Sequence, residues 1–351
     1  MARYTAGNYN TNTRLRIIYS IVGLLVFYLL IAFIFNFPPF SNDEQNAKPE
    51  QTDHLQAARE VVELGHPEQP IVVPVKPQVV EVNLAEIITD SNLDNDSNSQ
   101  AALLISKAND ALNDNPPQII KARDLLNEAL REPISDQQIK FVKAKLSQFA
   151  DEWLFSRQVF PEDILCDYYK VKPGDLLSEI GNLYKVPWQI LLDINNIKSE
   201  RSLQAGQKIK IINGPFHVKI NRSTFILDLY LQNTFVRSFR VGLGRPGYDT
   251  PTGLWLVAMG GKLIRPPWTD PDTGIRYESE NPNYPLGDRW ISIEGVKGEC
   301  TGRTGFALHG TKDPNEIGTA ASRGCVRLAN ENIVLLYKLL MPGFSQVQIV
   351  D

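Results

Sequence analysis

Hydrophobic and polar residues are distributed very unevenly along the chain, and the first feature is one long apolar run. Residues 17–35 contain no charged side chain and are numerous enough to cross a membrane as a helix. Arginines precede the run and carboxylates follow it, which predicts a cytoplasmic segment at 1–16 and a transmembrane anchor at 17–35. A cleaved signal peptide is the alternative, but no A-x-A-like site follows Phe35. We therefore expect a single-pass protein of the cell membrane whose later domains lie on the periplasmic, extracytoplasmic side.

The next segment, residues 36–98, is rich in Pro, Asn, Asp, Gln and Glu. It has too few apolar side chains to offset the entropy lost on folding. The composition predicts a disordered Pro/Asn/Asp-rich linker, semi-extended where proline is dense.

Helical periodicity begins at about residue 99 and lasts to about 156. Apolar residues recur three and four positions apart in three series, which are separated by Asn115-Pro116-Pro117 and by Pro133. The pattern predicts an α-helical hairpin segment at 99–156 that is similar to tetratricopeptide repeats. Two interpretations stay open: a module that binds a protein partner, or a spacer whose apolar faces pack only on each other.

After Gly214 the period of the apolar residues becomes two. Alternating runs at 216–220, 225–231 and 235–241, with turn residues between them, predict β-strands. A helix is expected at 331–340 and a last strand at 347–350. Residues 215–351 are therefore expected to form a mostly-β domain.

Composition excludes some classes of partner and site. The net charge is −4, so there is no basic excess to meet the phosphates of a nucleic acid. The three cysteines, Cys166, Cys300 and Cys325, are too far apart for a small disulfide framework or a metal site. We expect no metal and no cofactor. A bridge between Cys166 and Cys300 is left open.

The chemistry-bearing stretch is Gly305–Leu328, which holds one histidine, His309, and one cysteine, Cys325. A cysteine nucleophile needs a base, a small neighbour and backbone amides for an oxyanion. His309 is the candidate base, because imidazole titrates nearest neutral pH. Gly324 is the small neighbour, and the arginines on either side of the cysteine favour a thiolate.

His-Gly-Thr at 309–311 and Ser-x-Gly-Cys-x-Arg at 322–327 resemble the active-site signature of the YkuD family of L,D-transpeptidases. Thr-Pro-Thr-Gly at 250–253 and the stretch from Pro-Pro-Trp268 to Gly287 agree with it. The resemblance covers residues 215–351. It implies a β-sandwich-like module with the cysteine near a sheet edge, and acyl transfer on peptidoglycan stem peptides that cross-links the cell wall.

The resemblance also implies roles for individual residues. Cys325 is the nucleophile, His309 the base, and the backbone carbonyl of Gly310 orients the imidazole, with Asp313 as the alternative. The amides of Gly324 and Cys325 are expected to hold the oxyanion. Expected substrate-binding residues are Ser322, Arg323, Arg327, Thr311, Trp268 and Tyr284, the last two as parts of a lid; for Arg327 a purely structural salt bridge is the alternative.

Residues 167–213 resemble a small βααβ LysM domain, because Tyr169–Asp175 opens them with Pro-Gly-Asp and Asn195-Asn196 follows the second helix. The family binds glycan that contains N-acetylglucosamine, which implies contacts from Gly174, Asp175 and Asn195. Leu176 stands where a threonine is common. A spacer of the same shape is the alternative.

The acceptor of the acyl group stays open. An amine of another stem peptide gives a cross-link, water gives an L,D-carboxypeptidase, and a protein amine gives a protein-to-wall ligase. A non-catalytic protein that only binds peptidoglycan is the remaining alternative.

Overall fold

The computed structural model describes residues 99–351. The predicted cytoplasmic segment, membrane anchor and linker (1–16, 17–35 and 36–98) lie outside the described residues and stay predictions. Between residues 99 and 351 no helix is both long enough and apolar enough to span a bilayer.

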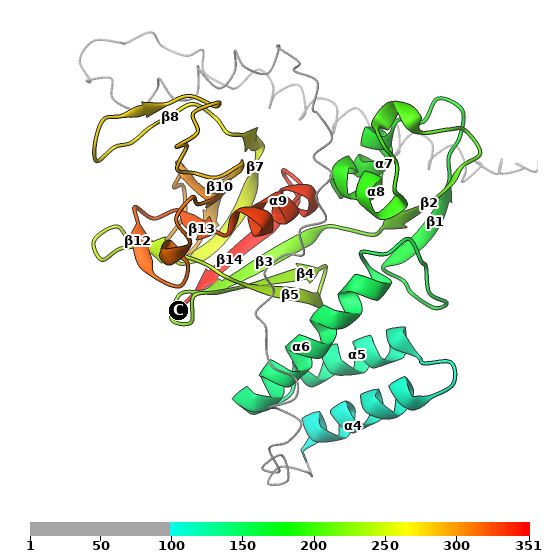
Figure 1. The fold of residues 1–351 in the computed structure, drawn as a ribbon. Helices are drawn as coiled ribbons and strands as arrows, with labels where there is room; N and C mark the ends of the chain where they lie inside the picture. The colour runs from blue at the N-terminus through cyan, green and yellow to red at the C-terminus, as the bar shows by residue number, and fades with distance from the viewer. Residues whose placement is uncertain (1–98) are drawn as a thin grey trace, which may run out of the picture. The chain divides into compact units, whose positions relative to one another are not determined.

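Three helices open the described part of the chain (Figure 1): α4 (Gln100–Asn113), α5 (Ile119–Ala129) and α6 (Asp136–Trp153). The side chain of Ser99 accepts the N–H of Ala102 at 3.1 Å and so caps α4. At the start of α6, Ser135 and Gln138 form a capping box, each bonding the backbone of the other. Alanines on the facing sides of the helices are fully buried, which lets the backbones approach closely.

A small βααβ unit follows, made of β1 (Cys166–Lys170), α7 (Leu177–Leu183), α8 (Trp188–Asn195) and β2 (Lys208–Ile212). The two strands pair antiparallel, from Cys166 opposite Ile212 to Lys170 opposite Lys208. The expected LysM architecture, two strands with two helices between them, is confirmed.

Eight strands of the last domain form one mixed sheet in the order β13-β11-β10-β7-β14-β3-β4-β5. Their bounds are β3 Phe216–Asn221, β4 Ile226–Leu231, β5 Thr234–Arg240, β7 Gly253–Ile264, β10 Arg289–Lys297, β11 Phe306–Gly310, β13 Val326–Leu328 and β14 Gln346–Val350. Two short ribbons accompany the sheet: β6 (Leu243–Gly244) with β12 (Ala320–Ser322), and β8 (Trp268–Thr269) with β9 (Arg276–Tyr277). The short 3-10 helices are η3 (Glu200–Ser202) and η4 (Pro314–Glu316).

The sheet is continuous because the long strand β7 pairs with two neighbours. It pairs with β14 at its first residues and with β10 along most of its length. The sequence predicts a sandwich-like module; the strands instead form one hydrogen-bonded sheet, and the mostly-β character of the domain is confirmed. Helix α9 (Asn330–Leu339) packs against β10 and β11 and buries Ile333 and Leu336 there (Figure 1).

The helical segment packs on the sheet through α5, α6 and β5. The backbone N–H of Phe235 donates to Oδ1 of Asn127 at 2.7 Å, and both residues are buried. Arg237, 2% exposed, donates to Asp151 of α6 at 2.5 Å. The helices therefore do more than pack on each other, so the interpretation as a spacer whose apolar faces contact only one another is wrong.

Lys210, on β2, is a fully buried cation whose ammonium is held by backbone carbonyls. Its ammonium donates to the backbone carbonyls of Trp153, Ser156 and Gln158 at 2.5, 3.0 and 2.7 Å. These carbonyls belong to the last residue of α6 and to the segment just after it, where a positive charge is favourable because of the helix dipole. Burial lowers the pKa of Lys210 from its ordinary value. The side chain joins the βααβ unit to the end of α6.

We predict that Lys210→Met destabilises the protein by about 1–3 kcal/mol, because the buried carbonyl of Trp153 and two partly buried carbonyls lose their donor. Lys208→Met is the matched control: Lys208 is exposed on the same strand, over the ring of Tyr168. It is expected to change stability by less than about 0.5 kcal/mol. Urea unfolding of the full chain measures both variants, and equal midpoints for the two would contradict this role of Lys210.

Candidate active site

The parallel pairing of β11 with β13 brings the candidate base and nucleophile to one edge of the sheet. Its register sets His309 opposite Arg327 and Leu308 opposite Val326. Cys325 directly precedes β13, an edge strand of the sheet. Because His309 lies opposite Arg327 in this register and Cys325 comes two residues before Arg327, the strand pairing brings all three residues to one locality.

The His309 imidazole is held by its own neighbour. Its Nδ1 lies 2.6 Å from the carbonyl oxygen of Gly310, and the ring is 3% exposed. Since a carbonyl only accepts, Nδ1–H donates and Nε2 keeps a free lone pair that can take a proton. This is the orienting bond that the family resemblance implies. The alternative orienter, Asp313, instead accepts from the backbone and side chain of Asn315.

Trp290 stacks on the imidazole. Its ring lies 5.3 Å from that of His309, at 10° to it, because the two residues are cross-strand partners on β10 and β11. The indole N–H donates to Ser292 at 2.8 Å, which fixes the plane of the stack. Sequence analysis missed Trp290. The signal that could have found it is the alternation of Ile291 and Ile293 with polar residues directly after it, which is typical of a strand.

The carbonyl that orients His309 is itself supported by the Leu286-Gly287 landmark. A Cβ on Gly287 would meet the Cα of Gly310 at 2.6 Å, and its φ of +68° also favours glycine. Beside it, Asn330 accepts the N–H of Asp288 at 2.7 Å and donates to its carboxylate at 2.5 Å. The loop 286–288 thus packs directly against the backbone of Gly310.

The turn that carries the nucleophile is closed by one hydroxyl. Ser322, 1% exposed, donates from Oγ to the carbonyl of Cys325 at 2.7 Å and accepts the N–H of Gly324 at 3.0 Å. Two expectations change. Ser322 is a structural residue of the turn, not a free substrate contact. The Gly324 amide is already bonded, so it is not available to an oxyanion in this arrangement.

Gly324 has a second reason to be glycine. Its φ is +108°, and a Cβ would meet the Phe306 ring at 2.7 Å. Any side chain would strain the backbone and push into the core of β11. The small neighbour that the sequence places beside Cys325 is therefore required by the turn itself.

Burial sets the protonation of both reacting groups. It lowers the pKa of His309 to about 4, while the Gly310 bond raises it and Arg327 lowers it further. Burial also raises the pKa of the Cys325 thiol; the backbone of Ala307 and Arg327 act in the opposite direction but do not win. Both groups are therefore neutral at pH 7. Arg327 favours the thiolate, as the sequence predicts, but desolvation outweighs its charge, so the net shift of the Cys325 pKa is upward.

Arg327 and Thr311 share one carboxylate. Glu316 of η4 accepts from the Arg327 guanidinium with one oxygen and from the Thr311 hydroxyl at 2.5 Å with the other. The backbone of Arg327 also exchanges two hydrogen bonds of 2.9 Å with Gly242. Of the two interpretations of Arg327, this geometry favours the structural salt bridge, and Thr311 has a structural bond as well.

The two aromatic residues expected to form a lid, Trp268 and Tyr284, have different surroundings. Trp268, half-buried on the β8–β9 ribbon, stacks on Tyr277 with centroids 6.1 Å apart. Tyr284 is 4% exposed, donates to the carbonyl of Pro266 at 2.5 Å, and has Arg265 over its ring. Trp268 thus belongs to the ribbon itself. Tyr284 is a buried residue that hydrogen-bonds the segment just before β8.

Of the three residues expected to contact glycan, two lie in an exposed loop and one is buried. Gly174 has a φ of +88° with open space around it, and Asp175 accepts from the Tyr169 hydroxyl and the Lys172 N–H at 2.8 and 2.7 Å. Both shape the exposed loop before α7. Asn195 is 3% exposed, and its amide bonds the backbone of Leu191 and Lys210. It is a structural residue of the domain, so its expected place among the glycan contacts is corrected.

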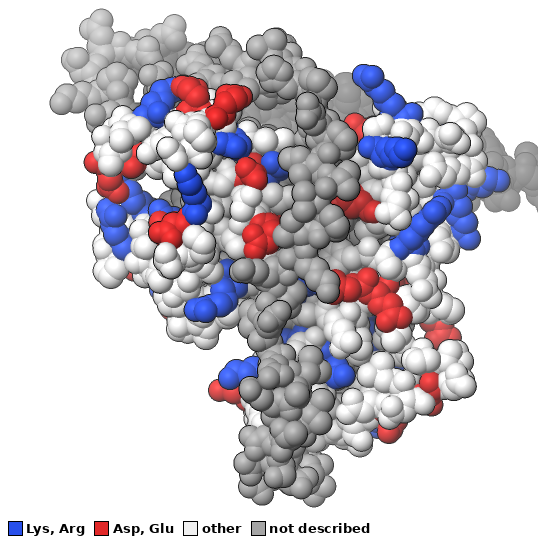
Figure 2. Space-filling model, in the orientation of Figure 1, with Lys and Arg blue, Asp and Glu red and all other residues white. Residues whose placement is uncertain are grey.

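The remaining cysteines are separate from the site. Cys166 and Cys300 are both buried free thiols, and no bridge joins them in the structure. Cys300 donates to the carbonyls of Leu254 and Lys297 at 3.2 and 3.3 Å. Across residues 99–351 no group of three or more His, Cys, Asp or Glu side chains could hold a metal ion. On the face in Figure 2, Lys and Arg are intermixed with Asp and Glu.

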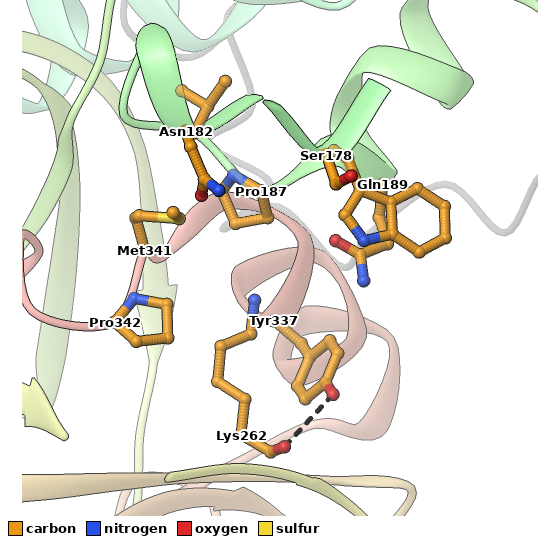
Figure 3. Close-up of a pocket in the computed structure, with 10 residues that line it drawn as sticks. Ser178, Asn182, Pro187, Gln189, Lys262, Tyr337, Met341 and Pro342 are labelled. Atoms are coloured by element: carbon orange, nitrogen blue, oxygen red, sulfur yellow. Dashed lines mark hydrogen bonds between the residues drawn. The ribbon is translucent and has the colours of Figure 1, made fainter. Parts of the chain in front are cut away.

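A cavity of about 220 Å³ lies elsewhere (Figure 3), between residues of α7 and α8 and residues of β7 and α9. Lys262 points into it, with its ammonium 4.4 Å from the centre of the Tyr337 ring. Burial, with a contribution from the charge of Arg289, lowers the pKa of Lys262 to about 7. Neither His309 nor Cys325 lines this cavity, so it is not the active site.

The site has the parts of a thiol acyltransferase: a half-buried cysteine, an oriented neutral histidine on the neighbouring strand, and a rigid turn that carries the nucleophile. Residues 215–349 match the YkuD family, the L,D-transpeptidase catalytic domain, and residues 169–211 match the LysM domain. YkuD of Bacillus subtilis (strain 168), provisionally named an L,D-transpeptidase, is 26% identical over 182 residues, which are 50% of this chain and 94% of that protein.

YqjB of the same organism, also provisionally named an L,D-transpeptidase, is 30% identical over 138 residues, 39% of this chain and 73% of that protein. The chain belongs to the YkuD family of L,D-transpeptidases, and its C-terminal domain is the catalytic domain of that family. A crystal structure of L,D-transpeptidase 3 from Mycobacterium tuberculosis, with a faropenem-derived adduct, is 17% identical with a TM-score of 0.31. The match covers 42% of this chain and 65% of that one. Because both the identity and the TM-score are low, the assignment to the family rests on the sequence relatives.

We predict that Cys325 reacts with iodoacetamide more slowly than an ordinary thiol at neutral pH, because its raised pKa leaves it protonated. The alkylation rate should rise about tenfold per pH unit and level off at higher pH than for glutathione measured alongside. Peptide mass spectrometry locates the label, since Cys166 and Cys300 are buried. A plateau reached by pH 7 would instead reveal a preformed thiolate–imidazolium pair.

Proposed function

We propose that the chain cross-links peptidoglycan through a thioester on Cys325. The observation that carries the proposal is the pairing of the half-buried Cys325 with His309, whose Nδ1–H is donated to Gly310. That bond fixes the tautomer with Nε2 as the proton acceptor. A histidine held only for packing would not need this orientation.

The reaction balances in two steps. In the first, the Cys325 sulfur attacks the carbonyl of the L,D bond of a donor stem peptide, and its proton passes to His309. The C–N bond breaks, His309 returns the proton to the leaving amine of D-alanine, and a thioester remains. In the second step the amine of a neighbouring stem attacks the thioester, loses a proton to His309 and restores the thiol. Because both resting groups are neutral, proton transfer accompanies the attack.

Burial keeps His309 in its unprotonated form, although a pKa of about 4 also makes it a weaker base toward the thiol. A base whose pKa is lowered to about 4 is unprotonated at every pH above about 5, so it is always available to the thiol. The Trp290 ring covers one face of the imidazole and limits its rotation. The base is thus positioned by two groups and needs no carboxylate partner.

The acceptor is the finer part of the proposal. Water in place of the amine makes the chain an L,D-carboxypeptidase, and a protein amine makes it a protein-to-wall ligase. Muropeptides incubated with the purified chain distinguish these by mass spectrometry. A 3-3 cross-linked product supports the transpeptidase; a shortened stem alone supports the carboxypeptidase. No change with any donor leaves a non-catalytic peptidoglycan-binding protein.

We further propose that the LysM domain holds the glycan strand whose stem peptides react, and that residues 17–35 anchor the chain in the membrane with both domains on the extracytoplasmic side. The support for the first is the LysM match at 169–211 and the exposed loop of Gly174 and Asp175. The support for the second is the uncharged apolar run and the arginines before it. A mature N-terminus near Ser41 would make the run a signal peptide.

We predict that Cys325→Ser abolishes acyl-enzyme formation with a stem peptide, because a hydroxyl is a weak nucleophile without a strongly matched base. His309→Gln should slow acylation by about 10²–10⁴-fold while the domain stays folded. Intact-protein mass spectrometry measures both. Cys300→Ser is the matched control, since the same atom is exchanged and Ser can still donate to Leu254 and Lys297. Acylation that survives in Cys325→Ser and fails in Cys300→Ser would show that the site is misassigned.

We predict that Gly174→Val weakens pelleting of the full chain with insoluble peptidoglycan. A Cβ there meets no atom within 4 Å, so the effect comes from the φ of +88°, which costs a β-branched residue about 1–2 kcal/mol and shifts the loop. Gly302→Val is the control, because Gly302 has a φ of +73°, equally open space, and lies in the catalytic domain. Pelleting reduced equally in both variants would argue against glycan binding by the LysM loop.

A further inference from the structure

Two arginines meet on the ring of Tyr248 beside the nucleophile turn. The guanidinium carbons of Arg245 and Arg323 lie 4.8 and 4.7 Å from the ring centroid. Between the two lies the carboxylate of Asp272, with Oδ1 3.2 Å from Arg323 and Oδ2 3.5 Å from Arg245. One carboxylate is therefore shared by two guanidinium groups, one oxygen to each.

The arginines belong to the same framework as Cys325. Arg323 comes two residues before it in the chain, and the N–H of Arg245 donates to the carbonyl of Ser322 at 2.9 Å. The N–H of Tyr248 donates to the carbonyl of Arg245 at 2.8 Å and closes the turn that holds the ring. The backbone thus fixes the arginine pair to the nucleophile turn.

Asp272 comes from a different part of the chain, the turn of the β8–β9 ribbon. This ribbon has two pairs of residues, Trp268 with Tyr277 and Thr269 with Arg276. The neighbouring Asp270 is occupied within the turn, where it accepts from the Asp272 N–H and from Thr273 at 2.9 and 2.8 Å. Arg323 adds only a minor lowering of the pKa of Asp270. Asp272 is therefore the carboxylate that the arginine pair contacts.

The contact is partly open to solvent. The side chains of Arg245, Arg323 and Asp272 are 39, 34 and 49% exposed. Ion pairs of this exposure contribute roughly 0–1 kcal/mol each, so another carboxylate can replace Asp272 at little cost. Guanidinium groups suit carboxylates because their donors match both oxygens.

We propose that Arg245 and Arg323, stacked on Tyr248, bind a carboxylate of the donor peptide, and that Asp272 occupies this site in the free enzyme as an internal competitor. The proposal rests on the proposed function, because a donor carboxylate reaches this position only if Cys325 reacts with the donor peptide. The carboxylate we assign is the terminal one of the leaving D-alanine, which is close to the scissile carbonyl. Internal carboxylates of the stem offer the same chemistry.

The test compares donor tetrapeptides that differ in one group. One carries the free terminal carboxylate, a second a terminal carboxamide, and a third a free terminus with its internal carboxylates amidated. Acylation of the full chain is followed by intact mass at several donor concentrations. The wild type should prefer the free terminus over the carboxamide by about 10–100-fold in kcat/KM, the range expected for a charged hydrogen-bonded contact. If kcat/KM instead falls with the third peptide and not with the terminal carboxamide, the site binds an internal carboxylate.

The variants give effects of opposite sign. Arg323→Gln and Arg245→Gln should remove most of the preference for the carboxylate while their rates with the carboxamide peptide stay near the wild type. Asp272→Asn should lower KM for the carboxylate peptide several-fold and leave the carboxamide peptide unchanged. Glu278→Gln is the matched control, since Glu278 follows the same ribbon but pairs with Arg276 at 2.7 Å. It should change neither peptide.

Three results would overturn the proposal: no discrimination between the peptides by the wild type, equal losses with both peptides in the arginine variants, or an Asp272→Asn variant that fails like the arginine variants. The last two would make the contact a structural latch. Calorimetric binding of the peptides to Cys325→Ala separates this idea from the proposed function. If Cys325→Ala binds the peptides in a carboxylate-dependent way but the wild type is not acylated, only the proposed function is refuted. If the wild type is acylated at the same rate whether or not the terminal and internal carboxylates are amidated, only the carboxylate site is refuted.

Discussion

The parallel pairing of β11 with β13 is the constraint on which the active site depends. Parallel neighbours need a long crossover, and here it is the chain from 311 to 325. That connection carries Glu316, the Ser322 turn and the nucleophile, so its length and the strand register together decide where Cys325 lies relative to His309. A one-residue slip in this register would turn Arg327 to the other face and separate the groups without changing any catalytic residue.

Within that frame, desolvation decides the protonation of the pair. Arg327 favours the thiolate, but Glu316 neutralises much of its charge, and burial raises the pKa of Cys325 and lowers that of His309. The thiol therefore stays protonated until a substrate is present to receive the attack. A protonated thiol is also less prone to oxidation, because oxidation follows thiolate character. Reactivity is thus gained at the moment of attack from a base held by Gly310 and Trp290.

The sequence could predict groups that lie close in the chain or in a motif. The histidine, the cysteine and the Gly310 carbonyl belong to this class, as do the alternating strands and the periodic helices. Trp290 and Glu316 were missed, because cross-strand pairing and crossover folding bring them to the site from outside the motifs. The sequence predicts that the Gly324 amide binds the oxyanion, because no other acceptor for its N–H is apparent in the motif. In the structure the Ser322 hydroxyl is that acceptor. Asn195 bonds the backbone of β2, so its place in the LysM pattern is explained by folding.

Three arginines surround the nucleophile, and their partners separate them physically. The Arg327 and Glu316 side chains are 20 and 27% exposed, Thr311 adds a second bond, and the backbone of Arg327 is paired with Gly242. Breaking this pair would leave a partly desolvated charge and disturb the strand edge, so it is suited to structure. Arg245 and Arg323 share a carboxylate that is 49% exposed and belongs to a short ribbon. Because water screens that contact and replaces it cheaply, only these two arginines are suited to exchange one carboxylate for another.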